Sequence, residues 1–187
     1  MVYGSSYGHT AKVVERIARG LIGRGHPVTV WKGDELPVGR SLDDFDAFVI
    51  AGSVLYGKHQ KCVRTFVQEH IGRLNLFPSA FVSVCGALAG SWEQGPKEAE
   101  KYVAGFVTDS GWHPRLTTSV AGAVAYTRYG FFTRLMMKLI SARTGRPTDT
   151  SRDWEFTDWD KVDGFTAEFA GLLQHLPVEE EALNVKC

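Results

Sequence analysis

Two kinds of hydrophobic pattern alternate along this chain. Short, nearly continuous apolar runs, clearest at residues 46–51 and 79–85, each end in a glycine. Such runs are typical of parallel strands that are covered on both faces. The longer segments between them carry apolar residues at every third or fourth position, which indicates amphipathic helices. The pattern therefore predicts strands and helices in regular alternation.

The predicted strands occupy residues 2–3, 27–31, 46–51, 79–85 and 117–124, and the predicted helices about residues 10–23, 60–74, 93–110, 131–142 and 159–176. Strands that alternate with helices form a parallel sheet with right-handed crossovers, wound on both faces. We therefore predict an α/β fold: a doubly wound five-stranded parallel sheet in the order 2-1-3-4-5, with a helical insertion after the fifth strand. Since no linker or repeat interrupts residues 1–187, we expect one domain.

Composition and charge exclude several classes of protein. Of the 187 residues, 44% are hydrophobic and 22% are charged, and the formal net charge is zero, so no overall field favours nucleic acid or an anionic membrane. The cysteines, Cys62, Cys85 and Cys187, are too scattered for a disulfide framework or a metal site, which indicates a reducing compartment. No run reaches the roughly 20 apolar residues that span a bilayer. We expect a cytoplasmic protein without a metal ion or a nucleic-acid partner.

The N-terminus begins abruptly. Residues 1–4 lack the charged and apolar regions of a signal peptide. Fewer residues precede Gly4 than the roughly five or six that are usual in a strand. The first strand is therefore either short or begins upstream of Met1.

The turn after the first predicted strand has the composition of a phosphate site. It reads Ser5-Ser6-Tyr7-Gly8-His9-Thr10 and opens a helix where the strand order reverses, the place where doubly wound sheets bind ligands. Small residues let backbone N–H groups approach a phosphate, hydroxyls add donors, and the helix N-terminus adds partial positive charge. The turn has no lysine or arginine and no spaced glycines, which distinguishes it from triphosphate and dinucleotide loops. The alternative is a plain capped turn.

Two further strand ends complete a pattern that favours FMN. A flavin requires backbone donors near its pyrimidine edge and an apolar or aromatic wall for its rings. The third strand ends in Ser53-Val54-Leu55-Tyr56-Gly57 and the fourth in Cys85-Gly86-Ala87-Leu88, and both sets are predicted cofactor contacts. We interpret Cys85 as a buried apolar residue and His59 as a helix cap or surface residue. The alternative for Tyr56 is a loop side chain that packs outward.

The segment after the fifth strand, residues 122–160, interleaves basic residues with aromatics and methionines. Its basic residues between positions 128 and 152 are Arg128, Arg134, Lys138, Arg143, Arg146 and Arg152. Three interpretations stay open: a helix at a membrane surface, a pocket wall for an apolar anionic substrate, or an ordinary amphipathic helix on the sheet. In the second, Arg128, Arg134 and Lys138 would bind substrate carboxylates.

Several longer stretches make the chain similar to a known family. They are Tyr56-Gly57, Arg73-Leu74-Asn75 before Pro78-Ser79-Ala80-Phe81, Ala121-Gly122-Ala123 before Arg128-Tyr129, Met137-Lys138-Leu139-Ile140, and Thr148-Asp149-Thr150 before Thr157-Asp158-Trp159. Together with the turn at residues 5–10, they make the whole chain resemble the flavodoxin-like, menaquinone-dependent protoporphyrinogen oxidases of bacteria. The resemblance implies a flavodoxin-like sheet. It also implies that the insertion sets the chain apart from electron-carrying flavodoxins.

The resemblance further implies a peripheral enzyme on the inner face of the cell membrane. It implies noncovalent FMN, oxidation of protoporphyrinogen IX to protoporphyrin IX in haem biosynthesis, and menaquinone or another quinone as acceptor. The expected chemistry is a hydride-type transfer from the tetrapyrrole to flavin N5, with no acid–base residue assigned. Two alternatives stay open: a flavodoxin-type electron carrier to protein partners, which the balanced charge and basic insertion disfavour, and an FMN-dependent quinone reductase.

Overall fold

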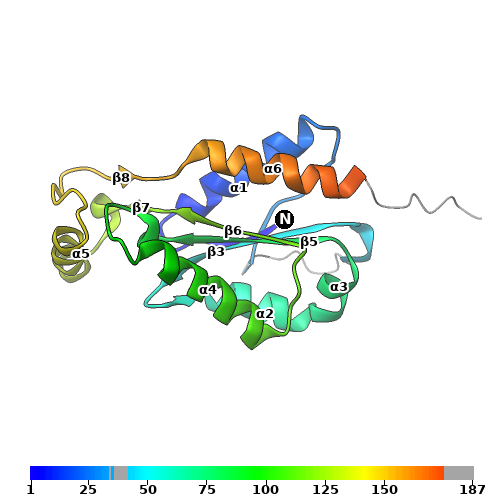
Figure 1. Ribbon diagram of the computed structural model, residues 1–187, viewed down its shortest axis with the longest axis horizontal. Helices are drawn as coiled ribbons and strands as arrows, with labels where there is room; N and C mark the ends of the chain where they lie inside the picture. Colours follow the sequence, from blue (N-terminus) through cyan, green and yellow to red (C-terminus); the bar gives the residue numbers. More distant parts are fainter. Residues whose placement is uncertain (34, 36–41, 175–187) are drawn as a thin grey trace, which may run out of the picture.

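A parallel sheet lies between two layers of helices in the computed structural model, which describes residues 1–33, 35 and 42–174 (Figure 1). The strands of this sheet are β1 (Val2–Gly4), β2 (Trp31–Lys32), β3 (Phe48–Leu55), β5 (Ser79–Cys85) and β6 (Leu116–Ala121). They run parallel in the order β2-β1-β3-β5-β6. The predicted α/β fold and its strand order are confirmed.

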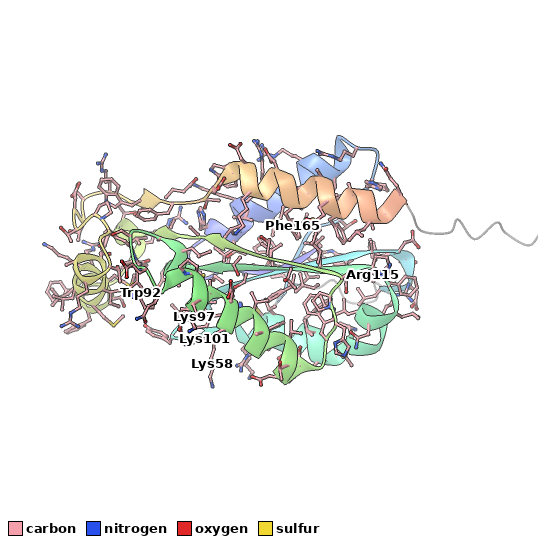
Figure 2. All side chains as sticks on the ribbon, viewed as in Figure 1. Lys58, Trp92, Lys97, Lys101, Arg115 and Phe165 are labelled. Atoms are coloured by element: carbon pink, nitrogen blue, oxygen red, sulfur yellow. The ribbon has the colours of Figure 1, made fainter. Side chains whose placement is uncertain are left out.

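Helices α1 (His9–Ile22) and α6 (Trp159–Gln174) cover one face of the sheet (Figure 1). The periodic apolar positions of α1, among them Val13 and Ile17, are fully buried against the sheet. From α6, Phe165 points toward the same core (Figure 2). Burial of this apolar face stabilises both helices, since each buried side chain of this size contributes about 1.5–3 kcal/mol.

Helices α2 (Lys61–Glu69), α3 (Ile71–Leu76) and α4 (Gly95–Ser110) cover the other face (Figure 1). Its core holds Phe81, Phe106 and Trp112, with the rings of Phe81 and Phe106 stacked 4.5 Å apart. Trp112 Nε1 donates to Ser79 Oγ at 2.9 Å, and Ser79 Oγ donates to the Leu74 carbonyl at 2.7 Å. The polar atoms of this core are therefore paired rather than left unsatisfied.

The predicted fifth strand at 117–124 is wrong in its second half. Strand β6 ends at Ala121, and β7 (Ala123–Val124) leaves the main sheet to pair antiparallel with β8 (Trp154–Glu155). Gly122 is the switch point: its N–H donates to Cys85 of the main sheet at 3.1 Å, and its carbonyl accepts from Phe156 at 3.2 Å. A pattern of apolar residues cannot reveal that change of partner.

Two other predicted elements differ in extent. The predicted helix at 60–74 divides at His70, whose φ of −118° leaves helical geometry between α2 and α3. The predicted strand at 27–31 reduces to Trp31–Lys32, because β2 is an edge strand and its neighbour β1 has three residues to pair with. The predicted end of the last helix, at 175–176, and Cys187 lie outside the described residues.

The insertion forms a separate unit beyond the carboxyl ends of the strands. It contains the single turn η3 (Tyr126–Arg128) and helix α5 (Phe131–Arg143), which stands apart from both helical layers (Figure 1). The Tyr129 ring meets the ring of Tyr7 edge-on at 4.7 Å. The insertion is therefore attached to the turn between β1 and α1.

Candidate functional site

A cavity of about 260 Å³ opens at the carboxyl edge of the sheet. Five segments enclose it: the turn after β1, the end of β3, the chain after β5, residues 122–124 after β6, and helix α5 with the residues that flank it. This is the position at which doubly wound sheets bind ligands. Of the predicted cofactor contacts, the cavity wall contains Ser5, Ser6, Tyr7, His9, Thr10, Ser53, Val54, Leu55, Tyr56, Cys85 and Gly86.

The other predicted cofactor contacts lie next to this wall rather than on it: Gly8, Gly57, Ala87 and Leu88. Several wall residues were not predicted: Val84, Ala89, Gly122, Ala123, Val124, Tyr129, Thr133, Met136, Met137, Ile140 and Arg146. Residues 122–124 follow β6, so the rule that ligands bind beyond strand ends would have found them if it had been applied to the last strand as well. The remainder come mainly from the insertion, whose direction the sequence does not reveal.

The turn after β1 is arranged for an anion. Gly8 caps α1 with a left-handed φ of 85°, and its N–H donates to Ser5 Oγ at 3.0 Å. Ser5 itself lies on the cavity wall. Thr10 Oγ1 is buried on the cavity wall without a hydrogen-bond partner among the described residues. A buried hydroxyl without a partner is destabilising unless a ligand pairs with it. These donors at a helix N-terminus fit a phosphate group.

A cation from the insertion reaches this same turn. Arg128 Nη1 donates to the carbonyl oxygen of Tyr7 at 2.6 Å. A Cβ atom placed on Gly8 would lie 2.8 Å from that same nitrogen, so the guanidinium rests directly against the turn. The insertion therefore supplies the positive charge that residues 5–10 lack.

His9 anchors α1 to the end of the insertion. The Thr157 hydroxyl donates its one hydrogen to the Ala121 carbonyl at 2.8 Å, so the Nε2–H of His9 donates to Thr157 Oγ1 at 2.6 Å. Its Nδ1 lies 3.7 Å from the carboxylate of Glu155, which also pairs with Lys12 at 3.2 Å. Burial lowers the pKa of His9, while Glu155 opposes that shift. His9 therefore acts as a structural link as well as a wall residue.

The end of β3 is a hairpin rather than the expected loop. Strand β4 (Lys58–His59) pairs antiparallel with β3, and the connecting residues Tyr56 and Gly57 have φ angles of 50° and 77°. Two positive φ angles define a type I′ turn, in which a tyrosine is unusual. The Tyr56 side chain is 76% exposed at the rim of the cavity. A strained, exposed aromatic at this place is suited to cover a planar ring.

Gln60 joins the hairpin to the turn after β1. Its Nε2 donates to Ser6 Oγ at 3.3 Å and also to Ser53 Oγ. Both serines are on the cavity wall. Gln60 thus fixes the spacing between the two segments predicted to bind the phosphate and the ring.

The interpretation of His59 as a cap or surface residue is wrong. His59 is 5% exposed, and its Nε2 lies 2.9 Å from Ser83 Oγ. Its ring packs edge-on against both rings of the stacked Phe81–Phe106 pair, at 5.1 and 4.9 Å. The hairpin causes this burial, because pairing of β4 with β3 turns His59 inward. Burial lowers the pKa of His59 to about 4, with a smaller contribution from the Arg64 cation.

Cys85 is buried, as the sequence indicated, and ends β5 at the cavity. Its sulfur accepts hydrogen bonds from the backbone of Leu88 and Ala87, in the single turn η2 (Gly86–Leu88). Burial nevertheless raises the pKa of this thiol. The thiol is therefore neutral, and a neutral buried thiol is a poor nucleophile.

The three basic residues predicted to bind carboxylates do not line the cavity. Arg134 donates to the carbonyls of Tyr126 and Tyr129 at 2.9 and 3.2 Å, so it holds the insertion together. Arg128 binds the turn after β1, and Lys138 is exposed on α5 outside the wall. The geometry does not support their assignment as substrate contacts.

The flavodoxin domain family matches residues 1–151 of this chain. Protoporphyrinogen IX dehydrogenase (quinone) of Leishmania major is 30% identical over 190 residues, which cover 100% of this chain and 80% of that protein. The enzyme with that name from Escherichia coli K12 is 37% identical over 130 residues, covering 70% of this chain and 71% of its own.

Solved structures share the fold. An archaeal flavodoxin superimposes with a TM-score of 0.54 at 18% identity, covering 93% of this chain and 96% of its own. Oxidised flavodoxin 1 of Bacillus cereus also gives 0.54, at 16% identity, covering 94% and 97%. The chain belongs to the flavodoxin domain family, in the branch that the two dehydrogenases represent. This membership supports a flavin as the cofactor.

Proposed function

We propose that this protein binds FMN in the cavity and oxidises protoporphyrinogen IX to protoporphyrin IX, with a quinone as electron acceptor. The proposal rests on one observation: the same cavity has two chemically different walls. One wall is the phosphate-type turn with the unpaired Thr10 hydroxyl, and the other is the apolar face of α5. An electron carrier to proteins has no need of the second wall, whereas an enzyme for an apolar substrate does.

The residues present fit FMN. Ser5, Ser6 and Thr10 would hold the phosphate at the N-terminus of α1, with Arg128 beside them. Tyr56 and Gly86 would flank the isoalloxazine ring. When bound, FMN supplies the electron-accepting chemistry, and the protein supplies position and electrostatics.

On the insertion side, Met136, Met137 and Ile140 form an apolar surface of the cavity wall. Methionines adapt to irregular apolar ligands, as a tetrapyrrole or a quinone would require. The relatives named above are called dehydrogenases of protoporphyrinogen IX with quinone, and their identity to this chain supports the same pair of substrates here.

The outer face of α5 supports a place at the membrane surface. Phe131 and Phe132 are 74% and 84% exposed, and Leu135 and Leu139 continue the same apolar face. Because its inner face lines the cavity, α5 is apolar on two sides, and such a helix is normally covered. Lys138 and Arg143 are exposed on α5 and would face anionic headgroups. No helix in the described part of the chain is long and apolar enough to cross a bilayer.

A turnover assay tests the proposal. Purified protein loaded with FMN should convert protoporphyrinogen IX to a fluorescent porphyrin with a menaquinone analogue, well above the rate of autoxidation without protein. FMN should also raise the melting temperature, because it binds the folded state. The proposal fails if the protein forms no porphyrin above the autoxidation rate but exchanges electrons rapidly with a flavodoxin reductase. The protein would then be an electron carrier.

A further inference from the structure

The chain after α5 is locked against the loop that follows β5. Gly90 and Gly145 both have left-handed φ angles, 81° and 67°. A Cβ atom on Gly90 would lie 2.6 Å from the Thr144 carbonyl, and one on Gly145 would overlap Ser91 Oγ. The Ser91 N–H also donates to the Thr144 carbonyl at 3.3 Å. Two glycines in sequence-distant loops therefore allow a close contact that fixes residue 146.

This contact positions Arg146 at the cavity. Its backbone N–H donates to Ser141 at 2.9 Å, and its side chain lies on the cavity wall. The Nη1 nitrogen is 3.5 Å from the position that a Cβ atom would occupy on Gly86. The guanidinium is therefore at the end of the cavity beside Gly86.

Arg146 is a buried cation that forms no ion pair with the described residues. It is 9% exposed, and its Nε has no hydrogen-bond partner among the described residues. No carboxylate of the described residues lies within ion-pair distance of it, and the polar groups near it include the Cys85 thiol and the Tyr126 and Tyr129 hydroxyls. Burial lowers the pKa of Arg146 as a result. A buried charge without a counter-charge destabilises a fold, so we expect the ligand of Arg146 to be an anion in the cavity.

We propose that Arg146 stabilises the negative charge of the reduced flavin ring; the inference rests on the proposed FMN site. The anion beside Arg146 is not the FMN phosphate, because the phosphate is proposed to bind at the turn after β1, to residues 5–10 with Arg128 beside them. The oxidised isoalloxazine is neutral, and on taking two electrons and one proton it carries one negative charge, shared by N1 and the C2 carbonyl. A planar guanidinium matches that pair of acceptors.

The consequence is a selective effect on the reduced cofactor. A fixed charge in a water-poor site interacts strongly with charge that develops there. Arg146 therefore strengthens binding of reduced FMN more than binding of oxidised FMN. That difference raises the flavin potential and makes the cofactor a better acceptor of electrons from a substrate.

The test uses Arg146→Met and Arg146→Lys, with Arg143→Met as a control that removes an exposed charge from the same segment. Affinity for oxidised FMN is measured by fluorescence titration, and the two-electron potential by anaerobic titration against reference dyes. We expect the R146M substitution to weaken binding of reduced FMN at least tenfold more than it weakens binding of oxidised FMN, whose affinity should stay within about threefold of the wild type. A tenfold difference between the two losses corresponds to a fall of about 30 mV in the two-electron potential. R146K should retain part of the effect, and R143M should match the wild type.

Melting of the apoprotein gives an independent measurement. Because R146M removes an unpaired buried charge, its apoprotein should melt at the same temperature as the wild type or higher. An unchanged potential in R146M, or equal weakening of oxidised and reduced FMN, overturns the proposal. An unchanged potential with a raised KM for the tetrapyrrole would assign Arg146 to a substrate carboxylate instead. If the wild type itself fails to bind FMN, the cofactor proposal is what fails.

Discussion

Arg128 and Tyr7 are joined by a 2.6 Å hydrogen bond from the guanidinium to the carbonyl oxygen, although 121 residues separate them in the sequence. The bond ties the insertion to the turn proposed to hold the FMN phosphate. It also places a positive charge beside Gly8, where residues 5–10 have none. The insertion thus serves the site in two ways: Arg128 binds the turn after β1, and Arg146 lines the cavity.

Replacement of Arg128 by Met should weaken the binding of FMN but not the binding of riboflavin. We expect FMN affinity to fall about fivefold, roughly 1 kcal/mol, because an exposed positive charge beside the proposed phosphate site is lost. Riboflavin lacks the phosphate, so its affinity should stay unchanged. Fluorescence titrations with both ligands measure this, with R143M as the charge control. Equal losses for FMN and riboflavin would show that Arg128 acts by holding the turn in shape.

Replacement of Tyr56 by Asn should stabilise the apoprotein and weaken the binding of FMN. Tyr56 has a φ of 50°, and Asn tolerates that conformation better, so the free energy of unfolding should rise by about 1 kcal/mol. Loss of the ring removes the proposed cover of the flavin, so FMN affinity should fall. Urea denaturation and FMN titration measure the two effects. Tyr56→Phe, which keeps both ring and strain, should behave as the wild type. If Y56N binds FMN as tightly as the wild type, Tyr56 does not cover the flavin ring.

Stability should decrease as the pH falls from 6.5 to about 4, owing to His59. Its pKa is lowered from 6.5 to about 4 by burial, so in this range the unfolded chain binds a proton that the folded protein does not. Above pH 6.5 both states are neutral and the full stability is present. The loss across the range is on the order of 3 kcal/mol. Urea denaturation at several pH values measures it. The His59→Gln variant can keep the hydrogen bond to Ser83 without titrating, so its free energy of unfolding should depend less on pH. If the pH dependence stays unchanged, groups other than His59 cause it.

Replacement of Phe131 and Phe132 by Ser should abolish binding to anionic vesicles. Both rings project into solvent from α5, and their burial in the membrane interface would contribute a few kcal/mol. Co-sedimentation with vesicles containing phosphatidylglycerol measures this. Leu76→Ser is the matched control, because Leu76 is 72% exposed on α3 and belongs to the opposite end of the strands. Equal losses in both variants, or no binding by the wild type, would contradict the proposed membrane face.

Much of the fold could be predicted from local patterns. The buried runs at β3 and β5 and the periodic face of α1 depend on neighbouring residues, so the sequence reveals them directly. The turn at residues 5–10 was also visible, because phosphate binding at a helix N-terminus needs particular residue types at adjacent positions. The hairpin at Tyr56–Gly57 was not predicted, and with it the burial of His59 was missed.

The sequence by itself determined the strand order, the phosphate-type turn after β1 and two of the three other strand ends that meet at the cavity, those of β3 and β5. Only the tertiary structure decided which basic residues serve the cavity. From the sequence, Arg128, Arg134 and Lys138 are as plausible as Arg146. In the structure, Arg134 binds backbone carbonyls, Lys138 is exposed outside the wall, and Arg146 is buried in the wall. The reason is physical: a charge acquires its role from what surrounds it, and the surroundings of Arg146 come from Gly86 and Gly90, more than fifty residues away in the chain.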